Sequence, residues 1–417
     1  AVLRRRPAVL PAGSPLVQFR HCPGTTLEIR RMKEEVESLR HRCELLEQQQ
    51  QTQRLIKFYA SVKRTPIDID QVVEKCRDPT YRQDVFCHRE LPVILAHMIA
   101  MLDQLPGGLV AMKNVGKVRA MLSSAFLAVT ECPVPQSEKQ GAEFRKVLER
   151  VMGELEPVVQ TMALAVLELR KLLTMHRQAL NDDKATRIKL RSLHDVPDLQ
   201  YSLDEFYLAF VQFKFLSLQL LQMAGSSSSE NAKEPEKGKA EPEEVVGIVD
   251  TGIDLLEVVR SARHNAELVC TEHHGDCPDI DIELADADDG RAFVSHLSDH
   301  LNYILVELIK NSLRATVDTH MARNSLGMVD CSDMPPVKVR IVTNKSPDTA
   351  TVIVSDQGGG IPREDMEKIM SYTYTSAPKS AHDGDEEPTL LAGYGYGLPM
   401  SRIHARIFGG DIMLHST

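Results

Sequence analysis

Three polar residues spaced for one face of a helix are the clearest candidates for chemistry in this sequence. Within residues 301–316, LNYILVELIKNSLRAT, a carboxylate, an amide and a guanidinium stand at positions 307, 311 and 314. Steps of four and three residues place Glu307, Asn311 and Arg314 on one stripe of an α-helix. Such a stripe could hold a metal-bound phosphate beside a water or hydroxyl, although the same spacing also fits a solvated helix face.

Two glycine clusters follow this helix, and each has the composition of a ligand-binding loop. Asp356 ends an alternating apolar segment, and the glycines after it, Gly358 and Gly360 among them, let the backbone turn sharply near a ligand. A carboxylate at a strand end can accept a hydrogen bond from an exocyclic amine such as that of adenine. Residues 393–398, GYGYGL, precede a helical segment, so their backbone N–H groups could receive phosphate. This cluster has neither the GK[ST] of a Walker loop nor the position of a Rossmann motif.

The elements that position these residues form a mixed α/β region. Alternation predicts strands at 279–284, 336–344 and 349–356, the last two joined as a hairpin, and another strand at 412–416. Helical spacing predicts helices at 255–273 and 301–316. Helices on one side of a mostly antiparallel sheet make an α/β sandwich. The predicted core stripe of the 301–316 helix is Leu301, Leu305, Leu308, Ser312 and Ala315.

The first half of the chain has helical patterns and no convincing strand. Long apolar helices with short connections predict a four-helix bundle, so the fold class is α+β with two domains. The bundle helices are expected at 90–105, 117–130, 142–176 and 202–224, after a helix capped by Asp68 or Asp70. An earlier helix, 26–60, has apolar residues at 29, 32, 36, 39 and 46; a coiled coil is possible, but an ordinary packed helix is favoured.

Composition sets the domain limits and excludes some classes of function. The net charge of −10 argues against a nucleic-acid binder, and without a run of 18 apolar residues we expect no membrane span. Eight scattered cysteines without a C-x-x-C indicate free thiols. Residues 1–24 carry four arginines and no acid, which predicts a mitochondrial transit peptide or a disordered basic tail. We expect a helical domain at 25–224, a disordered linker at 225–244, and a domain at 245–417 truncated at its C-terminus.

The order of the motifs is more specific than any one of them. An E-L-x-x-N helix comes first, then a strand ending in DxGxG, then a polar segment and GxGxGL. This order resembles the ATP-binding domain shared by gyrase, histidine kinases, heat-shock chaperone and mismatch-repair ATPases. Closer still, the chain resembles the mitochondrial 2-oxoacid dehydrogenase kinases, which act on pyruvate or branched-chain dehydrogenases. The segments that carry this resemblance are ELIKNSLRAT, SDQGGGI, MSYTYTSAP, GYGYGLPMSR, ELPVILAH, LDEFYL and SARHNAEL with HHGDCPDIDI.

The resemblance implies an activity, cofactors and partners. In this family a four-helix bundle precedes the α/β ATP-binding domain. The enzyme uses Mg²⁺ and ATP to phosphorylate serine on the dehydrogenase α subunit, which inhibits that enzyme. The implied setting is the mitochondrial matrix, the implied docking site is the lipoyl domain of the dehydrogenase complex, and the family is usually a homodimer.

Roles carried over by the motifs fall on the residues described first. Glu307 would be the general base, Asn311 would coordinate Mg²⁺, and Asp356 would bind the adenine amine. The implied nucleotide contacts are Glu307, Leu308, Ile309, Lys310, Asn311, Ser312, Leu313, Arg314, Asp356, Gly358, Gly360, Thr375, Ser376, Gly393, Tyr394, Gly395, Tyr396, Gly397 and Leu398.

The chain departs from the family pattern at several positions. Phe210 and Lys214 replace a basic pair in the last bundle helix, which puts an anionic-metabolite pocket there in doubt, and Ile94 replaces a usual arginine. Two other readings stay open: a non-catalytic scaffold that binds ATP, and a histidine kinase. His97 and His264 are the histidines considered as phospho-acceptors, and we interpret both as packing residues. Tyr394 and Tyr396 are interpreted as structural aromatics.

Overall fold

The computed structural model describes residues 23–78, 80–181, 196, 198–228, 245–285, 292–323, 333–343, 349–374 and 395–416. The chain divides into two compact units, Ala1–Leu55 and Ile56–Thr417. The transit-peptide prediction falls on residues 1–24, of which only the last two are described. Six described cysteines are free thiols, as expected: Cys43, Cys76, Cys87, Cys132, Cys270 and Cys277.

Helix α1 (Pro23–Ala60) contributes the described part of the first unit. Every residue from 30 to 51 is exposed in the structure. The choice between a coiled coil and an ordinary packed helix stays a prediction for this stretch. Its apolar residues alternate with charged ones, and such a stripe is buried only when a partner covers it.

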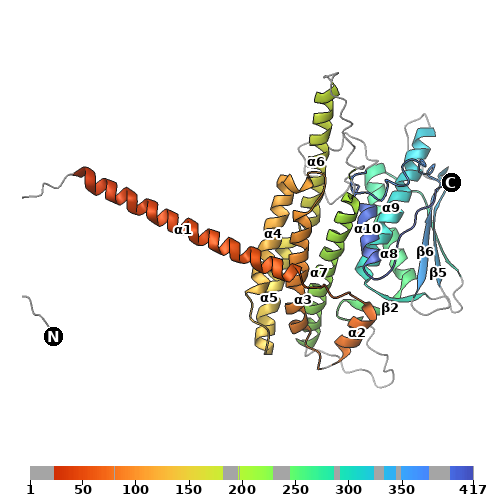
Figure 1. The fold of residues 1–417 in the computed structure, drawn as a ribbon. Coiled ribbons are helices and arrows are strands. Elements are labelled where there is room, and N and C mark those ends of the chain that lie inside the picture. Colours follow the sequence, from red (N-terminus) through yellow and green to blue (C-terminus); the bar gives the residue numbers. More distant parts are fainter. Residues whose placement is uncertain are drawn as a thin grey trace, which may run out of the picture. The chain divides into compact units, whose positions relative to one another are not determined.

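The second unit begins with a helical bundle (Figure 1). Helix α3 packs against α4 and α7, while α4 also packs against α5 and α6. Asp68 caps the short helix before the bundle, since its carboxylate accepts a hydrogen bond of 2.9 Å from the Gln71 N–H. The helices are α2 (Ile69–Arg77), α3 (Gln83–Asp103), η1 (Leu109–Ala111), α4 (Lys113–Thr130), α5 (Glu138–Leu155), α6 (Val158–Asn181) and α7 (Leu199–Ser228).

Several helical boundaries differ from the prediction, and α3, for example, begins at Gln83 instead of residue 90. The single helix expected at 142–176 is two helices, α5 and α6, because Pro157 has no N–H to continue the hydrogen-bond ladder and clashes with the preceding turn. Helix α7 continues through residues 225–228, which were predicted to open the linker. The remaining linker residues, 229–244, lie outside the described residues.

Helices α3 and α7 are long and apolar enough to cross a membrane by length and composition alone. Their most apolar windows have mean hydropathies of 1.4 and 1.2, and 61% and 67% of those windows is buried inside the fold. The two helices pack against each other in the bundle, which is the ordinary setting of apolar core helices.

The α/β part contains two small sheets. The first is antiparallel in the order β1-β2-β4, and in the second, ordered β3-β5-β6, β5 pairs with β3 in parallel and with β6 antiparallel. The predicted hairpin is confirmed, since Lys338 lies opposite Ser355. The bounds are β1 (Val245–Val246), β2 (Val249–Asp254), β3 (Ile280–Ala285), β4 (Phe293–His296), β5 (Val337–Thr343), β6 (Ala350–Ser355), α8 (Leu255–His274), α9 (Ser298–Arg323) and α10 (Gly397–Arg406).

The strand predicted at 412–416 is wrong. This segment is irregular, and Met413 is 80% exposed, so its alternating pattern faces no core. It is tied down instead by a hydrogen bond of 2.7 Å from the Ile361 N–H to the Ser416 hydroxyl. Strands β1, β2 and β4 were not predicted. In β2, for example, the sequence VDTGID contains a glycine and two aspartates, which interrupt the alternation of apolar and polar residues.

Two hydrophobic cores support this unit, and helix α10 belongs to the one centred on the bundle. Met400 and Ile403 of α10 pack with the bundle residues, whereas α8 and α9 enclose the core of the second sheet. The α+β fold class is therefore confirmed. The same packing means that the element carrying the second glycine motif is supported from the bundle side.

Candidate active site

Helix α9 buries one stripe and leaves the candidate polar residues off it. The buried stripe runs in steps of four through Leu305, Ile309, Leu313 and Val317. The predicted stripe was partly wrong, because Leu308 and Ala315 are only half-buried; the four-residue step follows the face turned to the sheet. Asn311 is exposed and the Arg314 side chain is 40% exposed, so both face away from the core.

Glu307 is the most enclosed of the three candidates. Its side chain is 17% exposed, and its carboxylate forms an ion pair with Lys310 one turn along the helix. The carboxylate also lies against the first residue of α10: a Cβ added to Gly397 would collide with Glu307 Oε2. Burial and the nearby Glu307 charge raise the pKa of Tyr303, one turn earlier. The helix motif and the second glycine motif therefore meet at Glu307 and Gly397.

Arg314 is held by a neighbour on its own helix. Its Nε lies 3.4 Å from Asp318 Oδ2, four residues further along α9. This pair is half-exposed on both sides, so it orients the guanidinium more than it stabilises the fold.

The first glycine motif packs directly on α9. At the end of β6, the Gly358 N–H donates a 2.9 Å hydrogen bond to Asp356 Oδ1, and the Gly358 carbonyl accepts one of 2.6 Å from Thr319 Oγ1. A Cβ at Gly358 would lie 2.5 Å from Ala315 Cβ and 2.6 Å from the Ala315 carbonyl carbon. Only glycine fits between this loop and the helix. Gly360 follows with φ of +74°, a conformation that glycine adopts readily.

The second glycine motif opens α10. Gly395 has φ of +79°, Tyr396 is the N-cap residue, and Gly397 begins the helix. The first N–H groups of a helix have no partner within it, and its dipole favours an anion there. Leu398 lies in this first turn and is half-buried. The candidates Thr375, Ser376, Gly393 and Tyr394 lie outside the described residues.

Helix α7 contacts residues 370–372, which precede the second glycine motif in the chain. Gln200 Nε2 donates to the Met370 carbonyl at 3.1 Å, and its Oε1 accepts from the Tyr372 N–H at 3.3 Å. The Tyr372 hydroxyl donates to Asp204 Oδ1 at 2.9 Å. Burial and the Asp204 charge raise the pKa of Tyr372, so this phenol stays protonated as a donor.

Helix α7 also contacts the chain just after residues 375–394, which lie outside the described residues. The hydroxyl of Tyr207 donates to the Tyr396 hydroxyl at 3.3 Å, and both rings are fully buried. Tyr396 therefore packs as an aromatic of the core, and its implied nucleotide contact stays a prediction. The bundle's part in holding residues 370–372 and 396 was missed, because no local pattern links Gln200 or Asp204 to residues so distant in the sequence.

A buried histidine cluster lies between α9 and α10. The rings of His300 and His404 are 4.3 Å apart by centroid, and Phe408 packs beside His300. Burial lowers the pKa of His300 to about 2 and that of His404 to about 4, so both rings are neutral at physiological pH. The cluster is a packing feature of the α9–α10 interface rather than part of the candidate site.

The two histidines considered as phospho-acceptors have different surroundings. His97 Nε2 lies 2.7 Å from the Val62 carbonyl, which agrees with its interpretation as a packing residue. His264 is exposed on α8, so the packing interpretation was wrong there, because its position falls outside the buried stripe of that helix.

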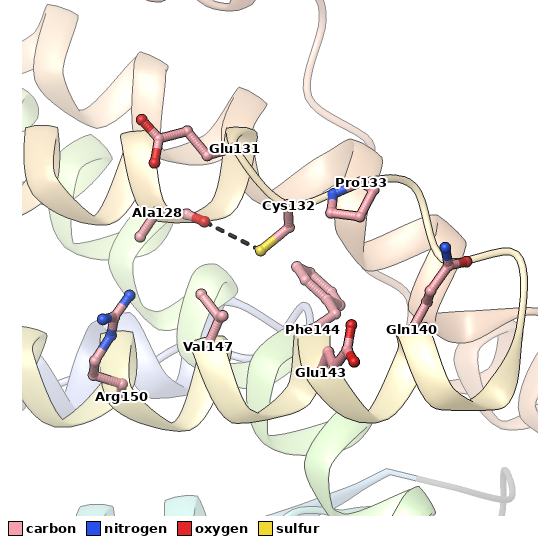
Figure 2. Close-up of a pocket in the computed structure, with 9 residues that line it drawn as sticks. All are labelled: Ala128, Glu131, Cys132, Pro133, Gln140, Glu143, Phe144, Val147 and Arg150. Carbon is pink, nitrogen blue, oxygen red and sulfur yellow. Dashed lines mark hydrogen bonds between the residues drawn. The ribbon is translucent and has the colours of Figure 1, made fainter.

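A cavity of about 340 Å³ lies elsewhere, between the end of α4 and α5 (Figure 2). Cys132 points into it and donates from Sγ to the Ala128 carbonyl at 3.3 Å, while burial raises the pKa of its thiol. None of the residues lining the cavity belongs to α9 or α10. Within the described residues, no cluster of three histidine, cysteine or acidic side chains could hold a metal.

Comparison with known proteins matches two parts of the chain to two families. Residues 66–250 match the family described as mitochondrial branched-chain alpha-ketoacid dehydrogenase kinase, and residues 296–417 match the histidine kinase-, DNA gyrase B- and HSP90-like ATPases. A mitochondrial pyruvate dehydrogenase (acetyl-transferring) kinase of Drosophila melanogaster is 30% identical over 372 residues, which cover 87% of this chain and 81% of that kinase. The mitochondrial pyruvate dehydrogenase (acetyl-transferring) kinase isozyme 3 of Homo sapiens is 30% identical over 370 residues, which cover 87% of this chain and 82% of that kinase.

Proposed function

We propose that this chain, which belongs to the family of mitochondrial 2-oxoacid dehydrogenase kinases, phosphorylates serine on the α subunit of its dehydrogenase and thereby inhibits it. Membership makes it an ATP-using protein kinase. The observation that carries the proposed site is the contact of the Glu307 carboxylate with Gly397, since it brings the acidic helix to the N-terminus that would receive phosphate.

Glu307 is proposed as the general base. It would accept the proton of the serine hydroxyl as that oxygen attacks the γ-phosphorus of ATP, and the bond to ADP breaks. Enclosure supports this role, because a carboxylate shielded from water interacts more strongly with a bound hydroxyl. The ion pair with Lys310 would keep Glu307 oriented until substrate enters.

The nucleotide contacts are proposed from three surfaces around α9. Asp356 is exposed at the end of β6, where it could accept from the adenine amine. The α10 N-terminus at Gly397 and Leu398 offers N–H groups for phosphate. The exposed amide of Asn311 would hold Mg²⁺, which neutralises phosphate charge when bound. The proposed contacts at Thr375, Ser376, Gly393 and Tyr394 rest on the family resemblance alone.

The partner is proposed to be a pyruvate or branched-chain dehydrogenase complex in the mitochondrial matrix. Both relatives described above are named for pyruvate dehydrogenase, whereas the family matched by residues 66–250 is named for the branched-chain enzyme. Docking through a lipoyl domain and a homodimeric state are proposed on the same family resemblance.

The test is phosphate transfer to purified pyruvate and branched-chain dehydrogenases, measured side by side with γ-labelled ATP. We expect transfer to one α subunit, loss of at least about a hundredfold in Glu307→Gln, and retained binding of a fluorescent ATP analogue. Glu267→Gln is the matched control, because Glu267 is also ion-paired within a helix, to Arg263 at 2.7 Å on α8. Full activity in Glu307→Gln would exclude it as the base.

The same assay separates the alternatives. ATP binding without transfer to either dehydrogenase would favour a non-catalytic scaffold. Acid-labile phosphate on the chain itself would favour a histidine kinase. Against it, neither the hydrogen-bonded His97 nor the exposed His264 is directly followed by a glutamate.

A further inference from the structure

Helix α1 carries an exposed apolar stripe with a heptad repeat. Met32, Val36, Leu39 and Leu46 are 64%, 52%, 54% and 50% exposed, and Cys43 is exposed between the last two. Their spacing of 4, 3, 4 and 3 residues assigns Val36 and Cys43 to position a and the other three to position d. An apolar stripe of this kind is stable in water when another helix covers it.

The charges beside the stripe are arranged for a copy of the same helix. In this register Glu35 and Arg42 occupy position g, while Arg40 and Glu47 occupy position e. In a parallel two-stranded coil, each g residue faces the e residue five positions later on the other strand. Glu35 would then face Arg40, and Arg42 would face Glu47, so each pair joins opposite charges.

We propose that α1 binds α1 of a second copy of this chain as a parallel, in-register coiled coil. An antiparallel pair that matches a with d is less favourable, because it places Lys33 opposite Arg40, two like charges, as well as Glu35 opposite Arg42, two opposite charges. In the parallel coil, by contrast, every charged g–e pair in this stretch joins opposite charges. Valine at a and leucine at d favour two strands. The stripe ends where Gln50 and Gln53 take the a and d positions. This proposal is independent of the kinase function, since it uses no residue of the candidate active site.

Cys43 makes the proposal testable in the full chain. In the parallel coil the two Cys43 thiols lie side by side, so diamide should oxidise them to one disulfide, each thiol giving up a proton and an electron to the diamide. We expect a covalent dimer that peptide mapping assigns to Cys43–Cys43 and that is absent from Cys43→Ser. An antiparallel coil, a helix folded back on its own chain, or a dimer formed only elsewhere would give no such bond and would overturn the proposal.

Two controls separate the coil from random collision. Gln48→Cys in the Cys43→Ser background places a thiol at position f, on the outer face, where cross-linking should be slower by on the order of tenfold. Leu39→Asp should abolish the Cys43 cross-link, whereas Leu45→Asp, at the outer position c, should leave it unchanged; Leu45 is 45% exposed and therefore comparable. Equal effects of the two leucine changes would contradict the assigned register.

The charge pattern is tested by mixing variants. Glu35→Lys alone and Arg40→Glu alone each place like charges across the coil and should slow cross-linking by on the order of tenfold. An equimolar mixture of the two chains restores opposite charges between strands and should recover the wild-type rate. Recovery cannot come from effects within one helix, so a mixture no faster than the single variants would refute the parallel pairing.

Discussion

Replacing Gly358 with alanine should detach the strand-end loop from α9 and weaken the proposed nucleotide site. The added Cβ would lie 2.5 Å from Ala315 Cβ and 2.6 Å from the Ala315 carbonyl carbon. Real contacts of this kind are near 3.5 Å or longer. Because one of the two atoms belongs to the helix backbone, no rotamer change relieves the overlap, and the loop must move.

The energetic cost follows from two terms. Overpacking against a rigid neighbour costs about 1–3 kcal/mol. Movement of the loop also weakens the 2.6 Å hydrogen bond from Thr319 Oγ1 to the Gly358 carbonyl, which contributes about 1 kcal/mol. The sum of about 2–4 kcal/mol corresponds to a fall in Tm on the order of 5–10 °C for a domain of this size. ATP affinity should fall with it, because Asp356 is two residues away.

Thermal unfolding and titration with a fluorescent ATP analogue measure both effects. Gly153→Ala is the matched control, since nothing lies within 4 Å of a Cβ there and alanine is the better helix former in α5. That variant should keep its ATP affinity and gain stability slightly. If Gly358→Ala keeps the wild-type Tm and ATP affinity, the loop is not packed on α9 as described.

Three further outcomes are expected. Gly397→Ala should lower kcat by on the order of tenfold or more with little change in Tm, because its Cβ would displace the movable Glu307 carboxylate and no backbone atom. An unchanged kcat would show that Gly397 does not position Glu307 for catalysis. Tyr207→Phe should lower the free energy of unfolding in urea by about 1–2 kcal/mol, because a buried hydroxyl partner is lost. Stability should be lost as pH falls below 6.5, because the unfolded chain then binds protons that His300 and His404 do not bind in the folded chain. With its pKa of about 4, His404 alone contributes a loss of about 2 kcal/mol at pH 5. Urea unfolding from pH 7.5 to 5 should show a smaller loss in His404→Leu and no change in His264→Gln.

Local patterns predicted the elements whose stabilising contacts are near in sequence. The hairpin of β5 and β6 and the helices α8 and α9 were found from periodicity, because each buries a face with a regular repeat. Prediction failed for two different reasons. The segment at 412–416 alternates like a strand but joins no sheet among the described residues, and that depends on long-range packing. The break at Pro157 is a local effect, which the helical spacing on both sides of the proline concealed.

The candidate site shows the same division between local and distant information. The spacing of Glu307, Asn311 and Arg314 placed them together on one helix, which the structure retains. Motif order could not reveal that Gly397 must be glycine to accommodate the Glu307 carboxylate. Nor could it reveal Gln200, whose amide holds the chain at Tyr372, because that contact depends on how the bundle packs.

Helix α10 contacts both the proposed base on α9 and helix α7 of the bundle. Its first residue touches the Glu307 carboxylate, while its N-cap Tyr396 is hydrogen-bonded to Tyr207 in the bundle. Further along, Arg406 lies 3.8 Å from Asp204, again on α7. The position of the proposed base is therefore set partly by α7, a helix that contributes none of the proposed nucleotide contacts. A substitution that loosens α7 from α10 should disturb phosphate transfer as well as stability, without removing any residue that contacts ATP.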